Sequence, residues 1–138
     1  MKNSPVRVLL IGAAGRMGRT VLDLAQGDRE INIAAECDLG DAIAPAMKNC
    51  DVAIDFSQAD STDEICRAAL QDGKPLVIGT TGHSQQQRKT IEQTAQSVPI
   101  VLASNFSVGV NVLFWLTQKA AEFLGSDFNP EKIGRAHV

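Results

Sequence analysis

Residues 6–18 read VRVLLIGAAGRMG and decide the fold. The first six are a largely apolar, β-favouring run, Val6 to Ile11, and the next seven hold three glycines. Apolar side chains then recur at Met17, Val21 and Ala25, the spacing of one face of an α-helix. A strand that enters a glycine turn and leaves as a helix is the first half of a βαβ unit.

The same alternation continues outward from this stretch. Residues 38–50 are the least regular and predict a short helix or a loop, whereas residues 110–124 predict a long amphipathic helix. Four further runs are predicted to be strands: residues 31–37, 52–56, 76–78 and 100–103.

Two more helices are indicated by their ends. Capping-box patterns predict helix starts at Ser61–Glu64 and at Ser84–Gln87. We expect the first helix to end at Asp72-Gly73 and the second at Pro99. Strands separated by helices pair in parallel, and these strands lack clean alternation, as in a sheet covered on both faces. The sequence therefore predicts an α/β, Rossmann-like fold with a doubly wound parallel sheet.

Composition narrows the functional classes. The chain has 138 residues, 44% of them hydrophobic and 21% charged, which suits one folded domain. The net charge of -3 without a basic patch argues against a nucleic-acid partner. The N-terminal apolar run is too short for a signal peptide or a membrane span, so we expect a cytoplasmic protein without a membrane partner. Three widely spaced cysteines without a C-x-x-C pair predict neither a metal site nor a disulfide.

The glycine loop, Gly12 to Gly18, predicts a pyrophosphate site. Glycine permits a tight turn and a close backbone approach, and the amides and dipole at the start of the next helix favour an anion. Glu36 closes the second predicted strand, where a carboxylate can bind the adenosine ribose hydroxyls of a dinucleotide. The alternative is a turn of small residues beside an unrelated surface acid.

The charges after Glu36 favour NADH over NADPH. A 2′-phosphate needs an arginine or lysine just after the acid, but Asp38 and Asp41 stand there, and the next cation is Lys48. Arg16 in the loop could serve that phosphate in part. We therefore expect NADH to be preferred, with NADPH possible.

Three segments follow the later strands at the edge where open α/β sheets bind ligands. They are residues 55–57, 79–82 and 104–109, all small or polar with nearby glycines. Such residues suit backbone contacts with a flat ring and an amide. Equally, they could be plain turns and caps, with Ser107 or Asn105 capping the last helix.

Four motifs occur in order along the chain: the loop Gly12–Gly18, the run Val-Ala-Ile-Asp-Phe-Ser at 52–57, Gly-Thr-Thr-Gly at 79–82, and Ala-Ser-Asn-Phe-Ser-Val-Gly-Val-Asn at 103–111. Together they resemble the N-terminal half of the 4-hydroxy-tetrahydrodipicolinate reductase (dihydrodipicolinate reductase) family, over roughly residues 6–130. The resemblance implies an NAD(P)H-dependent reductase of lysine and diaminopimelate biosynthesis, cytoplasmic and homotetrameric, acting on a small cyclic dicarboxylate. It also implies a substrate-binding α+β domain after the nucleotide domain.

Carried over by resemblance, the cofactor-binding residues fall into three groups. Glu36 would hold the ribose. The pyrophosphate would be held by Gly12, Ala13, Ala14, Gly15, Arg16 and Met17. The nicotinamide side would be lined by Gly79, Thr80, Thr81, Ala103, Ser104, Asn105 and Phe106. One departure, Cys37 where the family often has arginine, agrees with the preference for NADH.

The family's catalytic motif, a His-His-Arg-His-Lys run followed by Ser-Gly-Thr, does not occur in this sequence. We therefore predict no catalytic residue here, and cofactor binding without turnover. Residues 133–138, Ile-Gly-Arg-Ala-His-Val, match the translation of a common sequencing adapter, which removes His137 as a candidate. His83 is expected in a surface turn. The expected domains are a dinucleotide-binding domain (1–107) and the start of a truncated substrate domain (108–132).

Two other readings stay open. Another oxidoreductase, such as a semialdehyde or homoserine dehydrogenase, could share the nucleotide domain, although the Asn-Phe-Ser-Val-Gly-Val-Asn block at 105–111 is not expected there. A non-catalytic nicotinamide-nucleotide-binding module is the alternative from another functional class.

Overall fold

The computed structural model describes residues 4–128. These residues form two compact units, divided between Ser104 and Asn105. The predicted adapter-derived segment 133–138, with His137, lies outside the described residues. None of the helices within 4–128 is long and apolar enough to span a bilayer.

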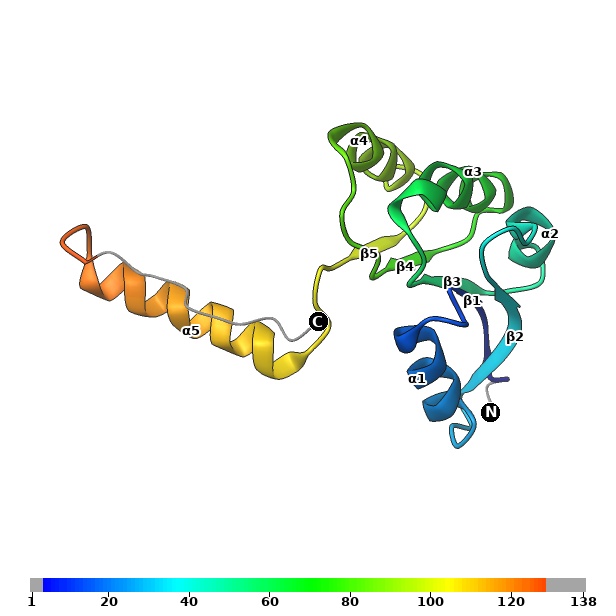
Figure 1. The fold of residues 1–138 in the computed structure, drawn as a ribbon, viewed down its shortest axis with the longest axis horizontal. Coiled ribbons are helices and arrows are strands. Elements are labelled where there is room, and N and C mark those ends of the chain that lie inside the picture. Colours follow the sequence, from blue (N-terminus) through cyan, green and yellow to red (C-terminus); the bar gives the residue numbers. More distant parts are fainter. Residues whose placement is uncertain (1–3, 129–138) are drawn as a thin grey trace. The chain divides into compact units, whose positions relative to one another are not determined.

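The first unit is a five-stranded parallel sheet with the strand order β2-β1-β3-β4-β5. One helix, α1, lies on one face, and α2, α3 and α4 lie on the other (Figure 1). This confirms the predicted doubly wound α/β fold. The strands are β1 (Val6–Ile11), β2 (Ile31–Cys37), β3 (Val52–Asp55), β4 (Leu76–Ile78) and β5 (Ile100–Leu102). The helices are α1 (Arg16–Ala25), α2 (Ile43–Met47), α3 (Thr62–Asp72) and α4 (Gln85–Thr94), with a 3₁₀ turn at Ala59–Ser61.

The main core lies between the sheet and the three helices α2, α3 and α4. Alternate strand residues point into it, and the helices add apolar side chains from their inner faces. Burial of these side chains is what holds the helices on the sheet. Its most deeply buried members are Leu9, Ile11, Met47, Cys50, Ala53, Ile65, Cys66, Ala69, Leu76 and Ile78.

Helix ends follow the sequence signals with one exception. Ser84 and Gln87 form the predicted capping box, with Gln87 N donating to Ser84 Oγ at 3.2 Å and Ser84 N to Gln87 Oε1 at 2.8 Å. Gly73 ends α3 with a positive φ of 62°. The capping box predicted at Ser61 is wrong: Ser61 closes the 3₁₀ turn with helical backbone angles, so its hydroxyl does not cap α3.

Helix α4 ends at Thr94, well before the predicted Pro99, and residues 95–98 form turns before β5.

The second unit holds one long helix, α5 (Val108–Leu124). Ser107 caps it, since Val110 N donates to Ser107 Oγ at 3.4 Å, and the helix therefore starts two residues before the predicted 110. Asn111 Nδ2 donates to the carbonyls of Asn105 and Ser107, at 3.0 and 2.9 Å. Helix α5 exposes large apolar side chains, among them Phe114, Trp115 and Phe123.

Candidate functional site

The candidate site lies where the carboxyl ends of the parallel strands meet. Chain order reverses between β1 and β3, so the connections leave these neighbouring strands in opposite directions. Backbone hydrogen bonds join the strand ends: Gly12 N to Cys37 O (2.7 Å), Phe56 N to Ile11 O (2.9 Å) and Gly79 N to Asp55 O (2.8 Å). Such a switch point is where open α/β sheets bind ligands.

Gly12 is glycine for two physical reasons. Its φ is +82°, which disfavours any residue with a Cβ. A Cβ placed there would also lie 2.6 Å from the Phe56 carbonyl oxygen and 2.8 Å from Ser57 N. The glycine loop therefore packs backbone to backbone against the turn after β3.

Gly18 lets α1 sit directly on the glycine loop. A Cβ at this position would lie 2.2 Å from Gly12 O and 2.5 Å from Ala13 O. The N-cap of α1 is Gly15, so the cap has no side chain, and the first turn carries no acid. The amides at this helix start are therefore available to an anion from the ligand side.

The other loop residues divide by exposure. Ala13 is buried, whereas Ala14, Arg16 and Met17 are exposed. The Ala14 amide donates to both carboxylate oxygens of Asp38, at 3.0 and 3.1 Å. Asp38 thus ties the end of β2 to the glycine loop.

A hollow of about 520 Å³ opens beside the loop. Three carboxylates, Asp38, Asp41 and Glu64, are among its lining residues, and none of the lining residues is a lysine or arginine. The rest of the lining comes from Ile11, Gly12, Gly15, Leu39, Gly40, Ala42, Ile43, Phe56, Ser57, Gln58 and Ser61. An acidic wall beside a phosphate-type loop suits a ribose diol and disfavours a further phosphate.

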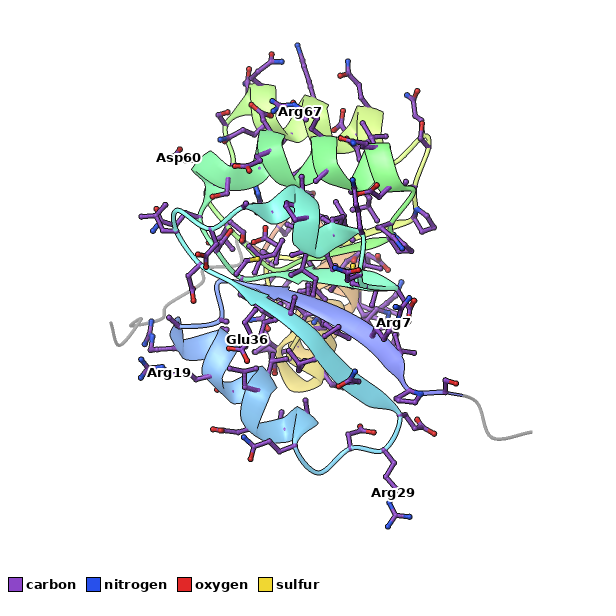
Figure 2. All side chains as sticks on the ribbon, turned by 90° about the vertical axis from the view of Figure 1, so that its right-hand side faces the viewer. Arg7, Arg19, Arg29, Glu36, Asp60 and Arg67 are labelled. Atoms are coloured by element: carbon purple, nitrogen blue, oxygen red, sulfur yellow. The ribbon has the colours of Figure 1, made fainter. Side chains whose placement is uncertain are left out.

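Glu36 does not line this hollow. It lies on the α1 side of β2 (Figure 2), where it borders a smaller hollow of about 300 Å³ with Leu22, Ala25 and Gln26. The cause is a bulge in β2: Val8 pairs with Ile33 but Leu9 pairs with Ala35, leaving Ala34 extra. Because strand side chains alternate, one extra residue reverses the faces of those that follow.

Asp38 is the residue that sequence reasoning missed as a binding group. It appeared there only as a charge that would repel a 2′-phosphate. Its position one residue beyond the strand, beside the hollow and on the loop amide, makes it a second candidate for the ribose. The Asp-Leu-Gly-Asp run at 38–41, typical of a turn, was the available signal.

The segment after β4 approaches the same edge. A Cβ at Gly79 would lie 2.1 Å from Cε1 of the Phe56 ring, so this glycine makes room for the ring. Thr80 is only 5% exposed, and its Oγ1 has no hydrogen-bond partner among the described residues. Thr81 is exposed. His83 is half-buried rather than on the surface, and its Nε2 also lacks a partner within residues 4–128.

The last group of predicted residues is split between the two units. Ala103 and Ser104 follow β5 in the first unit, and Ala103 N donates to Ile78 O at 3.1 Å. Asn105 and Phe106 belong to the second unit, where Asn105 Oδ1 accepts from Ser107 N at 2.7 Å. Asn105 and Ser107 therefore have a structural use at the start of α5.

Burial makes the Cys37 thiol a weak nucleophile. Burial raises the pKa of the Cys37 thiol, and the nearby Asp41 and Asp38 carboxylates raise it further, which keeps the thiol protonated. In the part of the chain that the structure describes, no three His, Cys, Asp or Glu side chains gather closely enough to hold a metal ion.

The family model described as dihydrodipicolinate reductase, N-terminus, matches residues 6–106. The chain belongs to this family. The matched range contains the glycine loop, the turn after β3 and the Gly79–Thr81 segment.

Relatives within the dihydrodipicolinate reductase family are longer than this chain. The 4-hydroxy-tetrahydrodipicolinate reductase of Akkermansia muciniphila is 43% identical over 132 residues, covering 96% of this chain and 54% of the relative. That of Zymomonas mobilis is 39% identical over 143 residues, covering 99% and 56%. The chain thus spans about half the length of the curated relatives it matches.

Solved structures agree on the fold. Dihydrodipicolinate reductase from Paenisporosarcina sp. TG-14, with dipicolinate bound, superposes with a TM-score of 0.73 at 19% identity, covering 86% of this chain and 54% of that one. A biliverdin reductase from Synechocystis sp., in complex with biliverdin and NADP+, superposes with a TM-score of 0.56 at 18% identity, covering 70% and 37%. At such identities the likeness concerns the fold alone.

Proposed function

We propose that this chain is the nicotinamide-nucleotide-binding part of a reductase that converts 4-hydroxy-tetrahydrodipicolinate to tetrahydrodipicolinate in lysine and diaminopimelate biosynthesis. The observation that carries the proposal is the glycine loop, packed without side chains at the β1/β3 switch point beside an acidic hollow. Membership of the dihydrodipicolinate reductase family supports the choice of reaction.

The pyrophosphate would lie on the glycine loop. Gly12 and Gly15 leave the approach to the loop free of side chains, and the first amides of α1 present donors at a positive helix end. Arg16, exposed at the start of α1, adds a positive charge on the solvent side. Ala13, Ala14 and Met17 complete the proposed contact segment.

The adenosine ribose has two candidate carboxylates. The family resemblance suggests Glu36, whereas the hollow beside the loop is lined by Asp38. A carboxylate has lone pairs for more than the one amide that Asp38 now accepts from, so it can also accept from ribose hydroxyls. We propose Asp38 as the main ribose ligand and keep Glu36 as the alternative.

We further propose that NADH binds more tightly than NADPH. A 2′-phosphate on the ribose would enter a hollow lined by Asp38, Asp41 and Glu64 and by no lysine or arginine. Repulsion at this partly solvated edge should weaken NADPH by about tenfold or more, ~1.4 kcal/mol. The preference should shrink at high salt, because salt screens these charges.

Gly79, Thr80 and Thr81 are proposed to line the nicotinamide side, with Ala103, Ser104, Asn105 and Phe106. Within residues 4–128 the Oγ1 of the buried Thr80 has no hydrogen-bond partner, which supports this, since such a hydroxyl suits a ligand that supplies one. The nicotinamide, when bound, supplies a hydride to the substrate. Within this chain the residues bind and orient the cofactor, and we propose no turnover by the chain alone.

The test is titration of the 138-residue chain with NADH and NADPH by calorimetry. Saturable binding with NADH the tighter ligand supports the proposal, and absence of binding by both nucleotides refutes it. The matched pair Asp38→Asn and Glu36→Gln then separates the two ribose candidates. Loss of one charge-assisted hydrogen bond weakens NADH roughly tenfold or more, and we expect that loss for Asp38→Asn but only a small change for Glu36→Gln.

A further inference from the structure

Asp55, the last residue of β3, is a buried carboxylate that the proposed function does not use. It is 1% exposed. Its Oδ1 accepts two hydrogen bonds from the same residue, Ser57 N at 2.9 Å and Ser57 Oγ at 2.5 Å. A side chain that accepts from the amide two residues on fixes a tight turn, here Asp55-Phe56-Ser57.

This turn stands between the two halves of the proposed cofactor site. Strand β3 lies between β1 and β4 in the sheet. Phe56 N donates to Ile11 O at the end of β1, and Gly79 N donates to Asp55 O at the end of β3. The turn is therefore the shared wall between the glycine loop and the segment after β4.

Neither side of the wall leaves room for movement. A Cβ on Gly12 would lie 2.6 Å from the Phe56 carbonyl oxygen, so the Phe56-Ser57 peptide fills that space. A Cβ on Gly79 would lie 2.1 Å from Cε1 of Phe56, so the Phe56 ring fills that space. A small displacement of the turn would therefore change the shape of both loops.

Asp55 itself does not line the hollow, whereas Phe56 and Ser57 do. On its other side Asp55 faces α3, where its charge is one of the smaller causes that raise the pKa of the Cys66 thiol, after burial of the thiol and Asp63. Burying a carboxylate is costly unless strong hydrogen bonds compensate it. Here the compensating donors both come from the turn.

We propose that Asp55 is a positioning residue for the nicotinamide nucleotide: through Ser57 it locks the Phe56-Ser57 turn against Gly12 and Gly79, so that the pyrophosphate and nicotinamide sides keep one fixed geometry. This inference rests on the proposed function. What matters is the acceptor oxygen at Oδ1, so an isosteric amide can replace the carboxylate.

The experiment measures NADH affinity of the 138-residue chain by the fluorescence of the bound nucleotide. Asp55→Ala removes the acceptor and should weaken binding roughly tenfold to a hundredfold, the loss expected from hydrogen bonds to a charged group. Asp55→Asn keeps an acceptor oxygen in place and should restore most of the affinity. Thr94→Ala is the matched control, because Thr94 is also a 1% exposed polar residue but lies at the end of α4, outside the turn.

If circular dichroism shows that Asp55→Ala is unfolded, a second variant tests the same hydrogen bonds. Ser57→Ala removes only the hydroxyl bond and should weaken binding several-fold. Adding Asp55→Asn to Ser57→Ala should weaken binding little further, because both substitutions act on one hydrogen-bonded pair.

The outcomes separate the two proposals. No NADH binding by the unchanged chain refutes the proposed function. Binding by the unchanged chain, with folded Asp55→Ala or Ser57→Ala binding equally well, overturns the positioning role alone. So does a loss in Asp55→Asn as large as in Asp55→Ala, or an equal loss in Thr94→Ala.

Discussion

Replacing Gly18 with alanine sets two opposed effects against each other. Gly18 lies in the first turn of α1, and alanine is favoured over glycine inside a helix by about 1 kcal/mol. Against this, the new Cβ would lie 2.2 Å from Gly12 O and 2.5 Å from Ala13 O, where ordinary contact begins at 3.4 Å. Helix α1 or the glycine loop must therefore move.

The magnitude follows from what the Cβ meets. Overpacking typically costs about 1–3 kcal/mol, and the upper end applies where the obstacle is backbone rather than a side chain that can turn away. The loop is held by Gly12 N on Cys37 O and by the Ala14 amide on Asp38, so it yields little. We expect Gly18→Ala to lower the free energy of unfolding by about 2 kcal/mol, the propensity gain included.

Urea unfolding followed by far-ultraviolet circular dichroism measures this, because Trp115 belongs to the second unit whereas α1 belongs to the first. Gly27→Ala is the matched control: nothing lies within 4 Å of its Cβ position, and its φ is not positive. That variant should be neutral or slightly stabilising, by about 0.5 kcal/mol. If Gly18→Ala were as stable as Gly27→Ala, the close packing of α1 on the loop would be refuted.

Three further predictions concern the scaffold. Ser84→Ala should cost about 1 kcal/mol of stability whereas Ser61→Ala should cost almost nothing, since only the first hydroxyl caps a helix, and equal losses in urea titrations would contradict this. The Arg7 guanidinium lowers the pKa of Asp51 to about 2, so the pair stabilises the fold above the ordinary pKa of aspartate, near 4, and that small contribution disappears as the pH falls through 2. In Asp51→Asn the free energy of unfolding should accordingly fall less steeply as the pH is lowered toward 2, and an unchanged pH dependence would argue against the ion pair. Burial raises the pKa of all three cysteine thiols, so they should react slowly with a thiol reagent at pH 8 and quickly in urea, and rapid native labelling would show that they are accessible.

The strands could be predicted because each is a short, mostly apolar run bounded by turn residues. The predicted strands Val6–Ile11 and Ile31–Cys37 match the bounds of β1 and β2 in the structure. The end of α3 at Gly73 was equally readable, because only glycine adopts its backbone angles without strain.

The two capping-box patterns show the limit of local rules. Ser84-Gln-Gln-Gln and Ser61-Thr-Asp-Glu look alike in sequence. At Ser84 the chain arrives extended, so the hydroxyl faces the helix amides. At Ser61 it arrives through a 3₁₀ turn with helical backbone angles, which turns the hydroxyl away. The approach of the chain is a property of the fold, not of the four residues.

The segments that carry the candidate site could be predicted, but not the directions of their side chains. The glycine loop and the segment after β4 are where the sequence puts them, yet the bulge at Ala34 that turns Glu36 toward α1 leaves no mark in the sequence. Phe56 packs against both Gly12 and Gly79, which lie 23 or more positions away in the sequence. Local sequence patterns cannot predict such a contact. Which carboxylate faces the hollow is therefore a structural finding.

We have proposed that the β1/β3 switch point binds a nicotinamide dinucleotide through the glycine loop. Amide chemical shifts of the ¹⁵N-labelled chain, recorded while NADH is added, report on this binding residue by residue. We predict saturable shifts centred on the amides of Arg16 and Met17 at the start of α1, with Gly12, Gly15, Asp38 and Gly79 affected to a lesser degree. Binding that leaves the chemical shifts of these amides unchanged, or no shift at millimolar NADH, would show that the glycine loop is not the binding site.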